Sequence, residues 1–143
     1  MKRLEQIRAG FAWEKVNEVK GRGGFDEYVG LVKKMPALIG TNGLGQALAF
    51  LVQKAGLDQN GRIKGDKPHG WLFEHIEAWL RAEERPHRGP FHGSGRDNVL
   101  VDLMESDSAT YLRATADAVG FLNYLRLFAA GLGKEKGNHG AEG

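Results

Sequence analysis

Glu74, His75 and Glu77 are the residues whose types and spacing come nearest to a catalytic site in this sequence. On a helix, Glu74 and Glu77 are three positions apart and therefore share one face. Two carboxylates on one face can form part of an acid–base or metal site. The same pattern is also common on solvated helix faces. A small metal-dependent helical enzyme that uses Glu74 and Glu77 is therefore one hypothesis.

Other catalytic patterns fail on spacing or on local structure. No two histidines have the i, i+4 spacing of a helical zinc site. Glu84 and His87 have the Glu-x-x-His spacing of a di-iron helix bundle, but Pro86 breaks the helix that would present them. The sequence has no cysteine, which removes disulfides and thiolate nucleophiles. We therefore expect no catalytic residue, no metal site and no cofactor.

A glycine-rich stretch, Thr41–Gly45, has the look of a phosphate-binding loop before a helix. A dinucleotide fingerprint needs a third glycine where Leu48 stands, and a P-loop needs Gly-Lys-Ser/Thr where this chain has Gly-Gln-Ala. The residues that follow are apolar almost all round a helix, which is typical of a central one. We interpret the stretch as the start of a core helix, with Asn42 as its N-cap.

The elements that position these residues are predicted to be helices. Apolar residues recur at helical spacing, and no period-two alternation bounded by hairpin turns indicates a strand. Pro36 predicts that one helix ends near Met35, because proline disfavours helical geometry in the residue before it. The helices are expected at about residues 3–20, 25–34, 42–56, 69–83, 97–105 and 108–132. The fold class is thus all-α, a single-domain bundle of five to six helices.

The domain is expected to cover residues 1–132, followed by a flexible tail at 133–143, which is rich in glycine and charge. Within the domain, residues 85–96 contain two prolines and three glycines and are predicted to form a mobile loop. The sequence shows no run long and apolar enough to span a membrane and no signal peptide. We therefore expect a cytoplasmic protein without a membrane partner.

Two of the helices carry more apolar surface than one core contact needs. The first has two apolar stripes, of which the second belongs either to the core of a broad bundle or to a surface for another subunit. The last helix has few charges and places small residues beside an aromatic on its outer side. We predict oligomerisation or docking through these faces. The predicted subunit-interface residues are Leu4, Ile7, Phe11, Gly120, Tyr124 and Leu127.

The net charge of +2 at pH 7 does not by itself indicate a nucleic-acid-binding protein. The basic surplus lies in residues 1–40. Lys33 and Lys34 fit two interpretations, a solvated helix end that favours the helix dipole and a pair of phosphate contacts. Composition and spacing leave a helical bundle with docking faces.

Three blocks of the sequence resemble a known family. The first contains Arg8, Ala12-Trp13 and Val16, and the second Tyr28, "VKKMPALI" (residues 32–39) and "NGLGQALAFL" (42–51). The third contains Asp107, "YLR" (111–113) and "FLNYLRLFA" (121–129). In this order they are similar to the small subunit of the type III-B CRISPR effector complex, the Cmr or RAMP module. The resemblance runs from about residue 8 to 130. The family commonly ends its last helix with a tryptophan, a leucine and two basic residues, where this chain has Tyr124-Leu125-Arg126-Leu127.

The resemblance implies an α-helical, non-enzymatic subunit that is present in several copies. Such subunits stack in a short filament beside the guide-RNA-bound backbone and line the groove that receives target RNA, while other subunits cleave. The implied partners are other CRISPR effector subunits, further copies of the chain and the duplex of guide and target RNA. The candidate RNA contacts, chosen by basic character and position in the matched blocks, are Arg8, Lys15, Lys33, Lys34, Arg113 and Arg126. A generic helical adaptor that docks proteins without RNA is the alternative.

Overall fold

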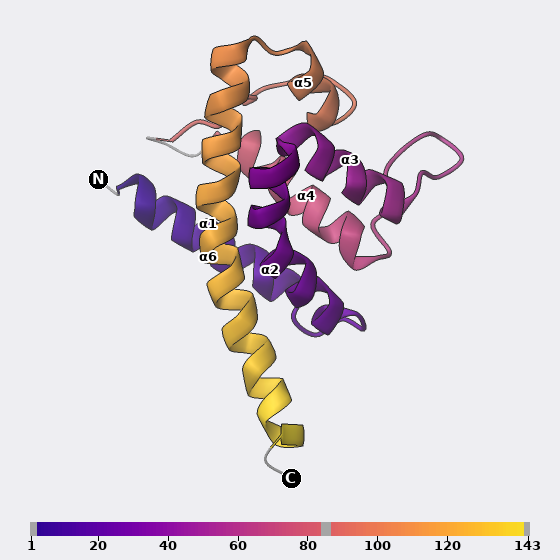
Figure 1. The fold of residues 1–143 in the computed structure, drawn as a ribbon, viewed down its shortest axis with the longest axis vertical. Helices are drawn as coiled ribbons and strands as arrows, with labels where there is room; N and C mark the ends of the chain where they lie inside the picture. Colours follow the sequence, from indigo (N-terminus) through magenta and orange to yellow (C-terminus); the bar gives the residue numbers. More distant parts are fainter. Residues whose placement is uncertain (1–2, 84–86, 142–143) are drawn as a thin grey trace.

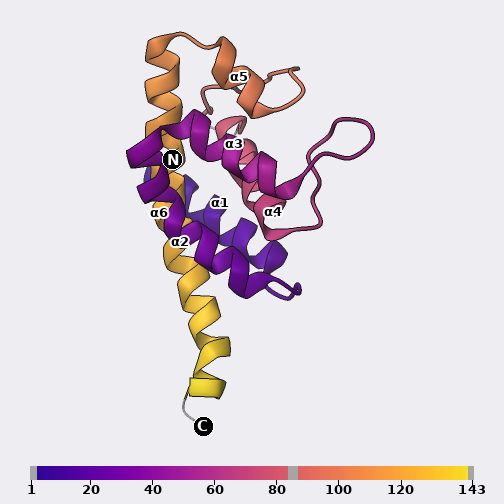
Figure 2. The same ribbon diagram turned by 45° about the vertical axis from the view of Figure 1, so that its right-hand side comes forward.

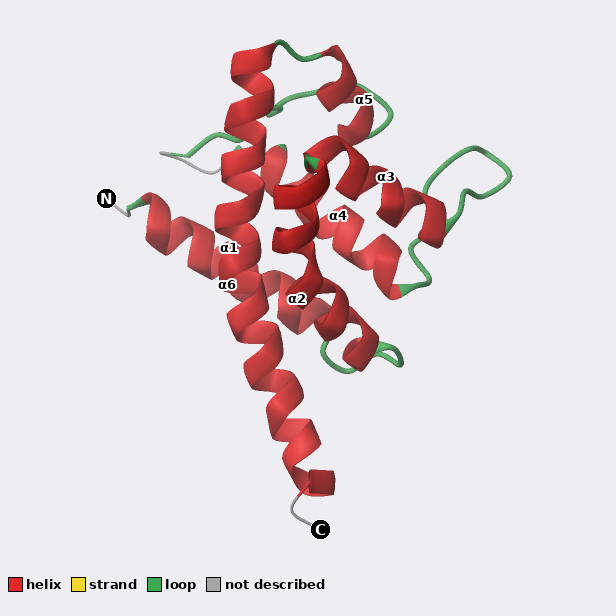
Figure 3. Ribbon diagram, in the orientation of Figure 1, coloured by secondary structure: helices red, strands yellow, loops and turns green. Residues whose placement is uncertain are grey.

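The computed structural model describes residues 3–83 and 87–141, with side chains up to residue 133, and shows six helices in these residues (Figure 1). The helices are α1 (Leu4–Val19), α2 (Phe25–Asn42), α3 (Leu44–Ala55), α4 (Pro68–Leu80), α5 (Val99–Glu105) and α6 (Ser108–Ala141). Figure 3 shows helices and loops in the described part of the chain and no strand; one isolated antiparallel bridge joins Leu57 to Ile63. The predicted fold class, an all-α single-domain bundle, is confirmed.

The long helix α6 runs down one side of the molecule and packs against α1 and α2 (Figures 1 and 2). Helix α4 packs against α2 and α3, and α5 lies at the end of the bundle next to α3. The C-terminal part of α6 extends beyond the other helices. None of the described helices is long and apolar enough to cross a membrane.

The hydrophobic core is built around aromatic side chains from several helices. Trp79 of α4 is fully buried and stacks on Phe121 of α6, with ring centroids 5.7 Å apart. Phe11 of α1 meets both rings at 5.2 and 5.8 Å. Such contacts bury large apolar areas and fix the mutual orientation of the helices. They hold α1, α4 and α6 together.

Helix α2 continues to Asn42, so the end predicted at Met35 is wrong. Pro36 lies inside the helix, where the lost hydrogen bond and the clash of its ring cost about 3 kcal/mol. Met35 and Ile39 are 1% and 4% exposed, and full burial of each such side chain contributes about 1.5–3 kcal/mol. Packing therefore outweighs the local preference of proline.

The start of α3 is also corrected. Asn42 is the last residue of α2, and Gly43, with φ of +90°, stands at the N-cap of α3 without a capping side chain. The hydroxyl of Tyr111 in α6 instead accepts a hydrogen bond from the backbone N–H of Gly45 at 3.0 Å. Glycine suits the positive φ at position 43 because it has no Cβ. The helix ends at Ala55 and is followed by Gly56, as expected.

The segment between α4 and α5 is attached to the core by hydrogen bonds. The backbone N–H of Phe91 donates to the carbonyl of Leu80, and that of Gly89 to the carbonyl of Ala82. The sequence predicted a helix to about residue 83, but α4 ends at Leu80. These hydrogen bonds take the place of the missing last turn. The predicted mobile loop at 85–96 begins in residues outside the described ones. Its mobility stays a prediction.

At the other end of the domain, α6 runs past Leu132 to Ala141. Gly133 still lies beside α2, since a Cβ built on it would be 3.3 Å from the side chain of Val29. A helix that is already formed extends at little cost for each added residue. The flexibility predicted for residues 133–143 also stays a prediction.

A buried polar contact joins α1, α2 and α4. The Tyr28 hydroxyl lies 2.7 Å from Nδ1 of His75, and the Nε2 of His75 lies 3.5 Å from a Glu18 oxygen. Burial lowers the pKa of His75 to about 4, although the Glu18 charge acts in the opposite direction. Burial also raises the pKa of Tyr28. Tyr28 therefore keeps its proton and donates a hydrogen bond to Nδ1 of a neutral His75.

This contact predicts a pH-dependent stability. Because the pKa of His75 is lower in the folded than in the unfolded chain, the unfolded state binds more protons between pH 6.5 and about 4. As the pH falls through this window, the free energy of unfolding should decrease by up to about 3 kcal/mol because of this residue. Denaturant titrations at several pH values should show a smaller fall in His75→Gln. Identical pH profiles for the two proteins would contradict the assignment.

Candidate nucleic-acid and subunit interfaces

Two of the predicted RNA contacts, Lys33 and Arg126, line one depression between α2 and α6. Its volume is about 360 Å³. We call this site the α2–α6 depression; its lining residues are Asp26, Val29, Lys33, Arg126, Leu127, Ala130 and Gly133. Residues 26, 29 and 33 share one face of α2, because they are spaced by three and four positions. The packing of α6 on α2 thus brings together cations that are distant in the sequence.

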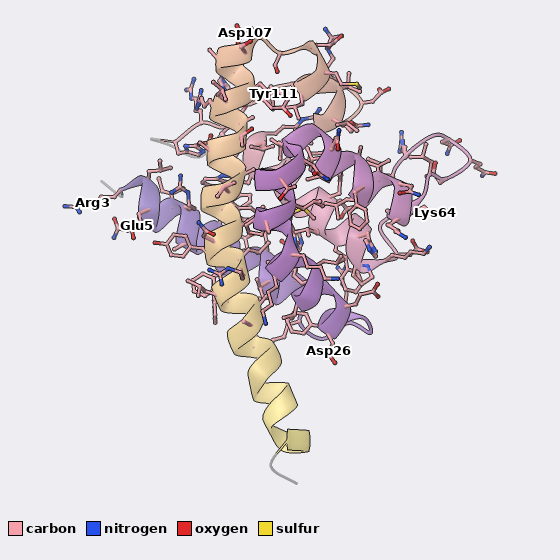
Figure 4. The ribbon with its side chains drawn as sticks, in the orientation of Figure 1. Arg3, Glu5, Asp26, Lys64, Asp107 and Tyr111 are labelled. Carbon is pink, nitrogen blue, oxygen red and sulfur yellow. The ribbon has the colours of Figure 1, made fainter. Side chains whose placement is uncertain are left out.

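The cations of this region have no internal partner in the described part of the chain. Lys33 and Lys34 are exposed and Arg126 is half-buried. None of the three takes part in an ion pair or a side-chain hydrogen bond with the residues that the structure describes. An unpaired cation keeps its full attraction for an anionic ligand. One carboxylate, Asp26, also lines the depression; Figure 4 labels this residue.

The other predicted RNA contacts lie elsewhere and have partners within the chain. Lys15 forms an ion pair with Glu18 at 2.9 Å and lies over the ring of Phe11. Arg113 donates a hydrogen bond to the carbonyl of Arg88 and lies 3.9 Å from Asp117. These contacts reduce what each cation can offer to RNA. The structure therefore does not gather the six predicted cations on one surface.

Arg8 lies between α1 and α6. A Cβ added to Gly120 would come within 2.6 Å of the Arg8 guanidinium carbon, and the Nε of Arg8 is buried without a hydrogen-bond partner among the described residues. Gly120 thus leaves the space that Arg8 occupies. Both residues contribute to contact between two helices of the same chain.

Four of the predicted subunit-interface residues contact other helices of this chain, and their role in a subunit interface stays a prediction. Ile7 is 3% exposed and belongs to the core, and half-buried Phe11 packs on Trp79. Tyr124 donates a hydrogen bond to Glu5 at 2.7 Å. Together with Gly120, these residues close the α1–α6 contact. Much of both apolar stripes of α1 thus packs inside the bundle, while Leu4 and Trp13 stay 40% and 48% exposed.

Leu4 and Leu127 are the interface residues that remain available, at 40% and 58% exposure. Leu127 belongs to a row of uncharged, exposed residues along the outer side of α6, opposite its buried side. We call this row the outer stripe: Ala109, Leu112, Ala116, Asn123, Leu127 and Ala130. Leu112 is 69% exposed. The stripe has no cover within the described part of the chain.

A second apolar surface lies between α2 and α3, where a groove of about 810 Å³ opens. We call it the α2–α3 groove. Its apolar lining consists of Leu31, Met35, Ala37, Leu38, Ala49 and Phe50, and its polar lining of Lys34, Thr41, Asn42, Gln46 and Gln53. The groove was not predicted from the sequence, because the second helix was expected to end near Met35. The spacing of Leu31, Met35 and Leu38 was the signal for a continuing helix.

Glu74 and Glu77 line a polar depression of about 580 Å³ with Asp97 and Asn98. One oxygen of Glu77 accepts a hydrogen bond from the backbone N–H of Val99 at 2.9 Å and lies 3.9 Å from Arg81. Glu77 therefore caps the first turn of α5. Burial and the charge of Glu77 raise the pKa of Glu74. Among the described residues, no group of three or more His, Asp or Glu could hold a metal ion.

The two carboxylates should respond differently to substitution. Glu77→Ala leaves the N–H of Val99 without its acceptor, so the free energy of unfolding should fall by about 1–2 kcal/mol. Glu74→Gln should keep or raise it, since the folded state already disfavours the Glu74 charge. Denaturant titration, repeated with and without Mg²⁺ or Mn²⁺, measures both effects. Tight ion binding that disappears in Glu74→Gln would favour the enzyme hypothesis.

Residues 4–132 match the model of a protein family described as CRISPR-associated protein (Cas_Cmr5). The chain belongs to this family. The fold is also similar to the X-ray crystal structure of a CRISPR-associated Cmr5 family protein from Thermus thermophilus. That similarity has a TM-score of 0.66 and 27% sequence identity, and it covers 92% of this chain and 98% of the other.

Family membership confirms the resemblance that the three sequence blocks indicated. The chain is a small subunit of the type III-B Cmr effector module. The family's partners include the other subunits of that complex. The middle block, residues 28–51, contributes Lys33 to the α2–α6 depression and forms most of the α2–α3 groove. This block of the family resemblance thus lies at the two surface depressions described above.

Proposed function

We propose that this subunit has no catalytic role, that it stacks with further copies beside the guide-RNA backbone in the cytoplasm, and that its α2–α6 depression contacts the phosphate backbone of RNA in the target groove. The observation that carries the RNA role is the convergence of Lys33 and Arg126, from two helices, in one open depression. Lysine and arginine bind phosphates without reading sequence. A groove that accepts any target needs this property.

The small number of cations fits a subunit that acts as one of several copies. Two cations release few counterions from RNA, so a single copy would bind weakly. Copies in a row along one RNA raise the effective concentration of each contact and multiply the affinity. A net charge of only +2 is sufficient for such a subunit.

Two grounds support the proposal that the subunit has no catalytic role: its family, and the structural contacts made by the residues that could have formed a catalytic site. Glu77 bonds to the N-terminus of α5, which gives it a structural task. His75 is buried against Tyr28 and cannot reach a ligand in solvent. The residues that came nearest to a catalytic site in the sequence are thus engaged in holding the bundle together.

The RNA role can be tested in a reconstituted effector complex. The Lys33→Glu/Arg126→Glu variant should weaken target-RNA capture by about tenfold or more, since each charged hydrogen bond contributes about 1.5–3 kcal/mol. The slope of log affinity against log salt should become shallower by about 1.5, because two phosphate contacts are lost. Capture measured at several KCl concentrations gives both quantities.

A matched control is Arg3→Glu/Lys64→Glu, which changes the charge by the same amount at exposed sites on opposite sides of the molecule (Figure 4). Its capture of RNA should follow that of the wild type. Equal capture by the wild type and by the Lys33→Glu/Arg126→Glu variant would contradict the RNA role and favour a protein-docking adaptor.

A further inference from the structure

Two uncovered apolar surfaces of this molecule match each other in length. On its α2 side the lining of the α2–α3 groove runs from Leu31 to Asn42, which corresponds to about 18 Å of helix. The outer stripe presents a straight helical row over a similar length between Leu112 and Asn123. A groove between two helices can take a third helix along its axis, held by side chains spaced three and four positions apart.

The two surfaces also match in chemistry. Lys34 is the one charged residue among the described residues that line the groove, and no carboxylate lines it. The outer stripe carries no charge, and its alanines allow close approach of another backbone. RNA does not suit the groove, because most of the lining is apolar and would leave phosphates without partners.

One end of the groove carries positive charge, and one end of the outer stripe carries negative charge. His69 packs on the Phe50 ring of the groove at 5.9 Å, and the positive charges of Lys54, Lys67 and Lys34 contribute to the lowered pKa of His69, after burial. Lys34 lines the groove, Lys54 follows Gln53 of its lining, and Lys67 is two residues before His69, so these lysines lie near one end of the groove; Glu27 lies 3.9 Å from His69. At the first turn of α6, Asp107 accepts a hydrogen bond from the N–H of Thr110 at 2.8 Å (Figure 4).

The corner before α6 adds apolar surface to this acidic end. Met104 is 70% exposed, and neighbouring Glu105 forms an ion pair with Arg96 at 2.8 Å. The hydrogen bond from Thr110 lowers the pKa of Asp107, so its carboxylate is charged. The corner and the stripe together form an apolar helix face with an acidic N-terminal end.

We propose that the outer stripe of α6 in one copy docks into the α2–α3 groove of the next copy, with the Asp107 end facing Lys34, Lys54 and Lys67. The proposal deepens the proposed function and rests on its claim that copies stack. Because the groove and the stripe are different surfaces, the contact is heterologous. In a row of copies, the copy at one end keeps its groove free and the copy at the other end keeps its stripe free. Repetition of this contact gives a filament that continues until a different subunit ends it.

The chain contains no cysteine, which allows the contact to be tested by introduced pairs. Ala49 of the groove and Leu112 of the stripe are exposed, so replacing them leaves the core intact. In the assembled effector complex, the double variant Ala49→Cys/Leu112→Cys treated with a short bis-maleimide should give covalent dimers and longer ladders of this subunit. Each single variant should give no covalent dimers, because its cysteine faces a surface of the next copy that has no cysteine. The Gln59→Cys/Leu112→Cys pair, with one cysteine in the loop after α3, is the matched control and should give none.

Two results would overturn the proposal. Dimers formed by Leu112→Cys alone would indicate that α6 packs on α6 of another copy, and the absence of a ladder in the double variant would show that groove and stripe do not meet. Neither result depends on RNA capture. A ladder in a complex whose Lys33→Glu/Arg126→Glu variant captures RNA normally would contradict the RNA role and leave the docking contact standing.

Discussion

The contact of α6 with α1, α2 and α4 is the constraint on which the rest of the structure depends. Its buried residues are Ala114, Ala118, Phe121, Leu122, Leu125 and Ala129, and each is 0% exposed. The alanines let neighbouring helices come close, and Phe121 fills the space beside Phe11 and Trp79. This packing fixes the rotation of α6 about its axis. The rotation also fixes where the other faces of α6 point.

The surfaces of the protein follow from that rotation. On one flank, Tyr124 bonds to Glu5 and Phe128 packs edge-on against Trp13, which closes the seam with α1. On the other flank, Arg126 comes beside Lys33 of α2. The remaining side carries the outer stripe. A single buried row thus places a cationic depression and an uncovered apolar face next to each other on one helix.

Much of the fold could be predicted from periodicity and breakers, because they act locally. The all-α class, the break before Phe25 and the end of α3 at Gly56 follow from such signals. The interior proline of α2 and the cap of α3 could not be predicted, since Met35, Ile39 and Tyr111 meet their partners only in the folded chain. Tertiary packing overrode the local preference at both places.

The candidate site was predictable in part. The sequence named Lys33 and Arg126 among six cations, yet only the packing of α6 on α2 shows which two lie together. The same packing placed Ile7 in the core and set Gly120 and Tyr124 against α1, whereas hydrophobic periodicity had left core and interface open for the first helix. Periodicity finds an apolar face, but what covers that face is a property of the whole fold.

We propose that the side of α6 left free by its own bundle is used by neighbours and by RNA. A cryo-electron microscopy map of the assembled effector complex with bound target RNA tests it most directly. We expect RNA phosphate density within ion-pair distance of Lys33 and Arg126, and we expect a neighbouring subunit to cover Leu112 and Leu127. A map in which both leucines face solvent and both cations lie away from RNA would contradict it.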